Sequence, residues 1–292
     1  MLKRTLGAKI LAALAIVLVA GCAAVGPNYA PPSIPAPEQW SADLENGLIP
    51  PPPSPEVLSQ WWTTFDDPIL TSLVVRAVQG NLDIRQALSR IREARARRAI
   101  SVAGFFPTVD ASGSRSFSRS SEEFGRGDRT DSYSVGFDAA WELDIFGGVR
   151  RSVEAADAEL EATEEDLHDV LIILIAEVGL NYIDVRTLQE RLVSARSNLE
   201  IQEETYELVI ARHEAGLTSR LDVDQARYNL ESTRAQIPAL ETGLHQAANR
   251  IAVLLGEYPG AVDNELSPKQ PIPAPSMEIA VGVPAEALRR RP

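Results

Sequence analysis

The chain contains 292 residues, of which 41 are acidic and 28 are basic, so its formal net charge is −13. This acidic balance argues against a nucleic-acid partner, because binding to phosphates requires clustered lysine and arginine. The single cysteine excludes an internal disulfide framework and a cysteine-rich metal site, whereas 45% hydrophobic residues provide ample material for a core.

Residues 1–21 resemble a bacterial lipoprotein signal peptide. Three basic residues precede an apolar run from Ile10 to Ala20, which is shorter than the roughly 20 residues of a membrane-spanning helix and fits a secretory signal. The run ends in Val-Ala-Gly-Cys at Cys22, which resembles the lipobox whose cysteine is acylated and becomes the mature N-terminus. We therefore expect a covalent lipid such as palmitate on Cys22, and Ala23 after it favours sorting to the outer membrane. The alternative is an ordinary buried cysteine after a signal peptide.

A proline-rich strap follows at residues 22–58, where ten of the 20 prolines lie between Pro27 and Pro55. Such a stretch favours extended polyproline II backbone and resists helix formation. Residues 59–107 then show apolar residues at helical spacing in two stretches, the first of which begins at Pro68, so we expect N-terminal helices there. The arginines that close the second stretch suit a helix C-terminus. We interpret them as a solvated face rather than an anion site.

Between residues 108 and 146 the period of the pattern changes from 3.6 to two, which is typical of β-strands. Two stretches of about ten residues alternate between apolar or small and polar residues, as membrane-spanning strands do. We expect a transmembrane hairpin with one face toward a lumen and one toward lipid. The lumen-facing candidates are Ser112, Ser114, Ser116, Asp138 and Glu142, and the lipid-facing candidates are Val135, Phe137 and Trp141. A half-buried hairpin of a soluble protein is the alternative.

Aromatic residues gather at the end of this hairpin that is opposite its loop. In an antiparallel pair, Phe105 and Phe106 would lie level with Trp141 and Phe146. Aromatic side chains are enriched where membrane-spanning strands meet the headgroup region. The sequence therefore predicts an interfacial aromatic girdle at this end.

Residues 147–256 carry the pattern of two long antiparallel helices. No proline precedes Gly216 in this stretch, and apolar residues recur at heptad spacing, so we expect a rod of about 100 Å at 1.5 Å per residue. Gly216 is placed to end the first helix in a left-handed conformation, and Ser219 forms a capping pair with Asp222 for the return helix. Heptads continue along the return helix, and a second proline-rich tail occupies residues 257–292.

Six short motifs are distributed along the chain. They are Gly26-Pro27-Asn28-Tyr29, Trp61-Trp62 with Phe65 and Asp67-Pro68, the run from Trp141 to Gly147, the run from Arg212 to Val223, Leu254-Leu255-Gly256 and the terminal run from Leu288 to Pro292. Together they resemble the TolC-like outer-membrane efflux family, and specifically its NodT-type lipoprotein branch. The resemblance implies a mainly α fold with one β-hairpin. Long antiparallel coiled-coil helices would form a periplasmic tunnel wall, and two transmembrane β-strands would contribute to an oligomeric β-barrel.

The same resemblance implies a channel subunit of a tripartite efflux system, which exports small molecules through a passive duct. The implied partners are a periplasmic membrane-fusion adaptor, an inner-membrane RND pump, outer-membrane lipid and further copies of the chain, since family members are trimers. The turn between the two long helices, called the tip turn below, supplies the candidates for adaptor docking: Arg212, Gly216, Leu217, Ser219 and Leu221. For Gly216 and Ser219, a role confined to shaping the turn is the alternative.

The chain departs from the family pattern in length. Family chains contain two similar helix–hairpin–helix repeats, and the Leu-Arg-Arg-Arg-Pro sequence at residues 288–292 normally leads into the second repeat, which holds the gate residues. Three copies of one hairpin would supply six strands and six copies twelve, against about eight in the smallest membrane barrels. Two hypotheses stay open: a channel subunit, as a trimer or hexamer, and a truncated, non-channel periplasmic coiled-coil lipoprotein or scaffold. Unpaired edge strands would leave backbone groups without hydrogen bonds in lipid, which favours the truncated, non-channel hypothesis.

The sequence contains no pattern typical of a catalytic or metal site. Its three histidines, His168, His213 and His245, lack the spacing of metal ligands. A nucleophile elbow, a phosphate-binding loop and a dinucleotide fingerprint are missing. We therefore expect a protein that is not an enzyme and that carries no cofactor apart from the covalent lipid on Cys22.

Overall fold

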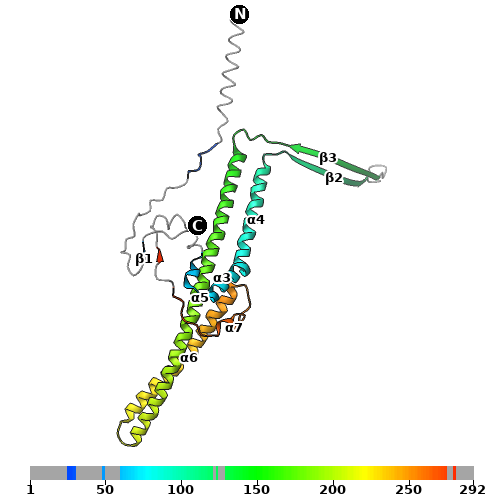
Figure 1. Cartoon of the computed structure of the whole chain (residues 1–292). Coiled ribbons are helices and arrows are strands. Elements are labelled where there is room, and N and C mark those ends of the chain that lie inside the picture. The colour runs from blue at the N-terminus through cyan, green and yellow to red at the C-terminus, as the bar shows by residue number, and fades with distance from the viewer. Residues whose placement is uncertain are drawn as a thin grey trace. The chain divides into compact units, whose positions relative to one another are not determined.

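The computed structural model describes residues 25–30, 48–49, 60–120, 123, 129–274 and 279–280. The signal peptide, Cys22, most of the strap, most of the loop of the β-hairpin and the end of the tail lie outside these ranges. The chain divides into two units, Met1–Pro32 with Ser89–Glu164 and Ser33–Leu88 with Glu165–Pro292. Helices α4 (Leu82–Ala103) and α5 (Gly148–Glu214) contribute residues to both units (Figure 1).

An antiparallel hairpin of two long strands dominates the first unit. Strand β2 (Thr108–Arg119) pairs with β3 (Arg129–Ala140), from Thr108 opposite Ala140 to Arg119 opposite Arg129. The predicted hairpin is therefore confirmed. Nearly every side chain of both strands is exposed, so the hairpin has no core of its own. Its apolar side chains are available to lipid or to another protein.

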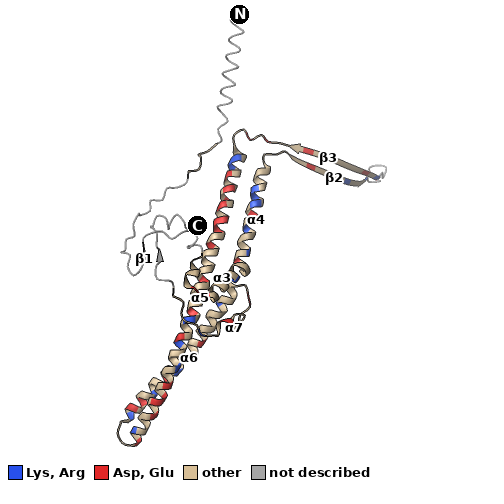
Figure 2. Ribbon diagram, viewed as in Figure 1, with Lys and Arg blue, Asp and Glu red and all other residues tan. Residues whose placement is uncertain are grey.

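Helix α4 and the first part of α5 are joined by ion pairs within the first unit. Arg95 Nη2 lies 2.9 Å from Glu164 Oε1, and Arg98 pairs with Asp157. Figure 2 marks the positions of the basic residues of α4 and of the acidic residues along α5. Arg95 and Arg98, two of the arginines predicted to form a solvated face, thus belong to exposed ion pairs, each of which contributes about 0–1 kcal/mol.

The second unit has an apolar core around the middle of α5. It comprises the 3₁₀ turn η1 (Trp61–Phe65) and the helices α3 (Pro68–Gly80), α6 (Arg220–Leu254) and α7 (Asp263–Leu266), with the adjoining parts of α4 and α5. Apolar residues three or four apart on α3, α5 and α6 meet in one cluster, as helical periodicity requires. The buried members include Leu70, Leu73, Val74, Ala77, Leu174, Val178, Tyr182, Val185, Ala247, Ala248, Ile251 and Ala252. Short strands β1 (Leu48–Ile49) and β4 (Ile279–Ala280) pair in parallel.

Helices α5 and α6 form a long antiparallel pair in the second unit, as the heptads predicted. The seam residues Leu192, Leu230 and Thr233 are buried between them. Two ion pairs of 2.8 Å, Arg196 with Glu241 and Arg234 with Glu203, join their exposed faces. Burial along the seam, rather than these exposed pairs, holds the helices together.

Two glycines allow backbones to cross where α3 and α6 end. A Cβ on Gly80 would lie 2.2 Å from the Leu255 carbonyl oxygen, and a Cβ on Gly256 would lie 2.4 Å from the Gly80 carbonyl oxygen. Gly256 also has φ = +73°, in the left-handed region. Since any side chain would collide with backbone at either position, only glycine fits this crossing.

Asp67 connects the start of α3 to the middle of α5. One of its carboxylate oxygens caps α3 by accepting from the N–H groups of Ile69 and Leu70 at 2.9 and 3.0 Å. The other accepts from the Tyr182 hydroxyl at 2.6 Å. Burial, followed by this hydrogen bond to a carboxylate, raises the pKa of Tyr182 to about 12.

Replacing Tyr182 with phenylalanine is expected to reduce the loss of stability at alkaline pH. A raised pKa means that the folded chain holds the proton more tightly than the unfolded chain, whose tyrosine pKa is about 10. The stabilisation is therefore complete below about pH 10 and is lost as the pH rises through about 12. Urea unfolding followed by circular dichroism across this window would measure it. Tyr258→Phe, at a side chain that is 88% exposed, is the matched control and should behave as the parent; an equal effect of both changes would contradict the assignment.

Arg186 is fully buried one turn after Tyr182. Its guanidinium lies over the Tyr182 ring at 4.9 Å from the centroid. Its Nη1 donates to Gln189 Oε1 at 2.9 Å and to the carbonyl oxygens of Leu266 and Pro268 at 3.2 and 2.9 Å. This side chain therefore attaches the segment after α7 to α5.

Candidate functional site

The turn that joins α5 to α6 is a Schellman motif. The Leu217 N–H donates to the Arg212 carbonyl oxygen at 2.8 Å, and the Gly216 N–H donates to the His213 carbonyl oxygen at 2.9 Å. Gly216 has φ = +73°, a conformation that glycine adopts without a Cβ clash. The predicted left-handed end of the helix at Gly216 is confirmed.

A capping box fixes the start of α6 immediately after this turn. The Ser219 N–H donates to Asp222 Oδ2 at 2.8 Å, and the Asp222 N–H donates to the Ser219 hydroxyl oxygen at 3.3 Å. The Ser219 hydroxyl also donates to Asp222 Oδ2 at 2.7 Å. This hydroxyl bond, followed by the backbone bond, holds the pKa of the Asp222 carboxyl below its ordinary value. His213 Nδ1 lies 2.9 Å from the Thr218 carbonyl oxygen, which can only accept, so Nδ1 carries the hydrogen.

The five residues expected to dock an adaptor divide into two groups in the structure. Gly216 and Ser219 build the turn through backbone conformation and capping. Leu217 and Leu221 are 73% and 74% exposed, and Arg212 is also exposed. The turn thus presents two leucines and a guanidinium on a backbone held by several hydrogen bonds, which is an arrangement suited to contact with a second protein.

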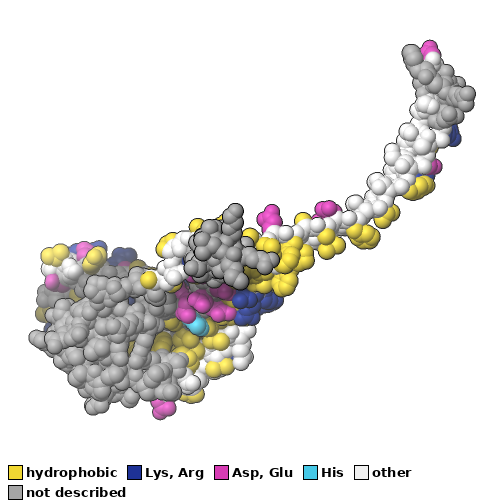
Figure 3. All heavy atoms as spheres, turned by 90° about the horizontal axis from the view of Figure 1, so that it is seen from above, with side chains coloured by type: hydrophobic (Ala, Val, Ile, Leu, Met, Phe, Trp, Pro, Cys, Tyr) yellow, Lys and Arg dark blue, Asp and Glu magenta, His cyan; other side chains and the backbone are white. Residues whose placement is uncertain are grey.

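The register of the β2–β3 hairpin sorts its side chains onto two distinct faces. Ala111 lies opposite Phe137 and Gly113 opposite Val135, whereas Ser114 lies opposite Ser134. Directly paired residues share a face, so the predicted polar and apolar sets of the two strands coincide. The polar face includes Ser112, Ser114, Ser116, Ser132, Ser134 and Asp138, and the apolar face includes Val109, Phe117, Tyr133, Val135 and Phe137. Figure 3 shows hydrophobic side chains gathered along one side of this hairpin.

Arg115 interrupts the apolar face toward the loop end of the hairpin. It pairs across the strands with Tyr133, and its guanidinium lies 5.3 Å from the centroid of that ring. Its Nη2 also lies 3.4 Å from the Asp131 carboxylate. Both partners offset its charge, so the apolar set continues past it to Phe117.

Trp141 and Glu142 do not lie within the strand, contrary to the sequence prediction. Strand β3 ends at Ala140, opposite Thr108. The residue before Thr108 is Pro107, which has no N–H to donate to a continued ladder. The pairing therefore stops one residue before Trp141.

Two of the aromatic residues at this end of the hairpin nevertheless lie close together. Trp141 Nε1 donates to the Phe105 carbonyl oxygen at 3.1 Å, which places these two residues at the same level. Phe106 and Phe146 are 65% and 68% exposed. An exposed aromatic group at the end of an apolar strand face is typical of a membrane interface.

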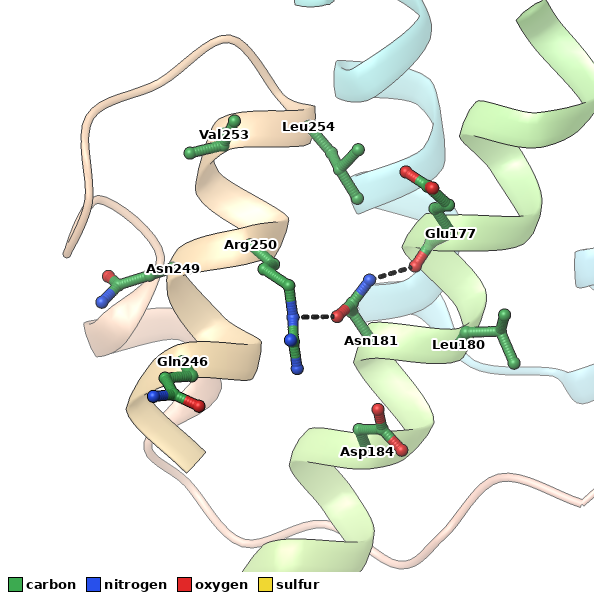
Figure 4. A pocket seen from close by; sticks show the side chains of 9 residues that line it. All are labelled: Glu177, Leu180, Asn181, Asp184, Gln246, Asn249, Arg250, Val253 and Leu254. Atoms are coloured by element: carbon green, nitrogen blue, oxygen red, sulfur yellow. Dashed lines mark hydrogen bonds between the residues drawn. The ribbon is translucent and has the colours of Figure 1, made fainter. Parts of the chain in front are cut away.

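The sequence did not predict an open groove between α5 and α6 in the second unit (Figure 4). Arg250 Nε donates to Asn181 Oδ1 at 2.8 Å, and Asn181 Nδ2 donates to the Glu177 carbonyl oxygen at 2.8 Å. The exposed side chains of Leu180 and Val253 also line it. Its central polar groups are bonded to one another, so they form no catalytic arrangement.

The described residues lack the features of a metal site and of a membrane-spanning helix. Within them, no three histidine, cysteine, aspartate or glutamate side chains gather as a metal site. Also within them, none of the helices combines the length and the apolar character needed to cross a bilayer.

Residues 73–257 match the family model described as "Outer membrane efflux protein". The chain is 36% identical over 279 residues to nodulation protein T of Rhizobium leguminosarum bv. trifolii, covering 94% of this chain and 58% of the relative. It is 30% identical over 287 residues to the cation efflux system protein CusC of Escherichia coli O6:H1, covering 97% and 60%. The solved outer-membrane channel OprN is similar with a TM-score of 0.78 and 37% identity, covering 91% of this chain and 59% of that one. The chain thus spans about three fifths of the length of these relatives.

Proposed function

Because the chain belongs to the outer membrane efflux protein family, we propose that it is a subunit of an outer-membrane channel through which small molecules leave the cell. The helices form part of a passive duct on the periplasmic side, and the β2–β3 hairpin crosses the outer membrane. The duct performs no chemistry of its own. Its cargo is small solutes. The described side chains of the hairpin and of the turn between α5 and α6 do not single out one kind of solute, such as the cations in the name of the relative CusC.

The single observation that carries this proposal is the separation of the two faces of the hairpin. Strands β2 and β3 are 12 residues each, which exceeds the roughly 9–11 residues that a tilted strand needs to cross the hydrocarbon layer. One face is largely apolar and exposed, and the other is rich in serine. Ser112, Ser114, Ser116 and Asp138 would face a water-filled lumen, and Val135 and Phe137 would face lipid, whereas a periplasmic scaffold gives no reason for this separation.

Self-association is part of the same proposal. Among the described residues, β2 and β3 pair only with each other, so both outer edges present unpaired backbone groups. In lipid each unsatisfied group costs several kcal/mol. Strands from further copies would satisfy these edges, in the trimer implied by the family resemblance or in a larger ring.

The tip turn is proposed as the docking site for a periplasmic adaptor that couples the duct to an inner-membrane RND pump. Leu217, Leu221 and Arg212 would contact the adaptor directly, because their side chains are exposed. Gly216 and Ser219 would hold the turn that presents them. Support comes from the rigid Schellman motif and capping box, since an ordered loop loses little conformational freedom on binding.

Lipidation at Cys22 completes the proposal. The residue lies outside the described part of the chain, and its covalent lipid rests on the lipobox-like sequence that ends the apolar run. A lipid on Cys22 would anchor the mature chain at the outer membrane, with a large periplasmic portion. No other cofactor is proposed.

Labelling of single introduced cysteines from outside intact cells tests the channel orientation. Glu123→Cys, between β2 and β3, is expected to react with a membrane-impermeant maleimide, because the hairpin loop would face the medium. Leu217→Cys, at the tip turn, should react only after the outer membrane is permeabilised. A chain in which both positions stay protected until permeabilisation would be a periplasmic scaffold, and the channel proposal would be wrong.

A further inference from the structure

Arg151, in the first turns of α5, holds the segment that follows the lipobox. Its Nε donates to the Val25 carbonyl oxygen at 3.1 Å. Its Nη2 donates to the Gly26 carbonyl oxygen at 3.3 Å and to Asn28 Oδ1 at 2.8 Å. One guanidinium thus bonds three acceptors within residues 25–28, a segment that is more than 120 residues distant in sequence.

The backbone of this segment is also fixed at the end of the hairpin. The Val25 N–H donates to the Phe146 carbonyl oxygen at 2.9 Å. Gly26 has φ = +95°, which lets the chain bend around the guanidinium without a Cβ penalty. The remaining arginine nitrogen, Nη1, donates to Glu154 Oε2 at 2.5 Å, which orients the side chain. Residues 25–28, Phe146 and Arg151 belong to the same unit of the chain.

Chain geometry limits how far Cys22 can lie from Val25. It precedes Val25 by three residues, and three extended residues span at most about 11 Å. A lipid on Cys22 would therefore enter the bilayer close to Phe146, which is 68% exposed. The aromatic end of the hairpin would lie at the same depth.

We propose that Arg151 is a positioning residue for the lipid anchor: it docks residues 25–28 so that the acyl chains on Cys22 enter the membrane beside the aromatic end of the β2–β3 hairpin. This inference rests on the proposed lipidation and membrane insertion. These contacts of Arg151 with residues 25–28, called the dock below, fix the depth of the hairpin relative to the anchor. Lysine cannot replace the arginine, because three separate acceptors need the planar fork of a guanidinium.

The neighbouring Arg150 provides a matched control. Its N–H donates to Asp144 Oδ2 at 2.9 Å, and its Nη2 donates to the Asp144 carbonyl oxygen at 3.3 Å. It has the same charge as Arg151 and precedes it directly on the same helix, and its hydrogen bonds go to Asp144 instead of residues 25–28. Arg150→Gln should therefore leave the dock intact.

Spin labels at Tyr29→Cys and Glu142→Cys of the full lipidated chain in detergent would report the dock by double electron–electron resonance. The distance distribution is expected to be narrow in the otherwise unchanged chain and in Arg150→Gln, and at least about twofold broader in Arg151→Gln and Arg151→Lys, because a released segment samples coil-like conformations. An equally narrow distribution in Arg151→Gln would overturn the proposal. Circular dichroism would verify that the helices of each variant are retained.

The same sample separates this proposal from the proposed function. The intact mass shows whether Cys22 is acylated, and an acylated cysteine takes no spin label. If the mass lacks the acyl groups, the lipidation is wrong and Arg151 positions no anchor. Cys22 would then take a spin label, so Cys22→Ser is needed before the distance distribution shows whether Arg151 docks residues 25–28. If the acyl groups are present and the distribution is unchanged by Arg151→Gln, lipidation stands and the positioning role of Arg151 falls.

Discussion

Replacing Gly256 with alanine is expected to destabilise the helical core by about 3 kcal/mol, from a left-handed backbone penalty and a steric clash together. Gly256 has φ = +73°, and a Cβ there would lie 2.4 Å from the Gly80 carbonyl oxygen. The contacted atom is backbone, which cannot rotate away as a flexible side chain can. The crossing of the segments that end α3 and α6 would have to separate, and the core beneath it includes Leu255 and Ala77.

Gly216→Ala is the control for the backbone part of this effect. Gly216 has the same φ of +73°, but no atom lies within 4 Å of the position that its Cβ would take. Its replacement should therefore cost only the left-handed penalty of about 1 kcal/mol. Urea unfolding of the detergent-purified full chain, followed by circular dichroism, would give the midpoints. Equal losses at the two positions would show that the Gly80 contact adds nothing.

The periodic parts of this fold were predictable because their signals are local. Heptad spacing with no proline before Gly216 predicted the long helix α5, and the Ser219–Asp222 spacing predicted the cap of α6. Alternation with a period of two predicted β2 and β3, since strand pleating places successive side chains on opposite faces. Each of these signals occupies a short window of sequence that needs no knowledge of distant contacts.

The parts that the sequence did not predict depend on contacts between distant residues. Gly80 and Gly256 meet only once the helices have packed, and neither glycine is unusual in its own segment. The bond from Tyr182 to Asp67 spans 115 residues. The burial of Arg186 is likewise hidden, because an arginine on a heptad-bearing helix is normally exposed. Such contacts follow from tertiary packing, and the periodicity of the sequence carries no information about them.

The candidate site shows the same division. The two faces of the hairpin could be predicted from alternation alone, and the register then brought the matching sets together. The end of β3 could not be predicted, because it depends on Pro107 lying across from Trp141. That placement is known only once the register of the two strands is known. The contacts of Arg151 with residues 25–28 were also missed, since these residues carry no pattern that refers to α5.

Replacing Phe137 with arginine is expected to abolish insertion of the hairpin into the outer membrane. Phe137 is 80% exposed on the apolar face, and an arginine facing lipid near the midplane costs about 2–4 kcal/mol. That cost corresponds to an equilibrium shift of about 30- to 800-fold, and it recurs in every copy of an oligomer. External labelling at Glu123→Cys, normalised to the total amount of chain, would measure insertion independently of the lipid anchor.

Ser112→Arg is the matched change on the opposite face at nearly the same depth, because Ser112 follows Ala111, the partner of Phe137. The residue opposite it is Gly136, which leaves room for the longer side chain. A water-filled lumen would solvate this arginine, so external labelling should stay close to that of the parent. Loss of labelling in Ser112→Arg with retention in Phe137→Arg would reverse the assignment of the two faces. Retention in both would contradict a lipid-facing Phe137, because hydrocarbon does not solvate an arginine whereas water does.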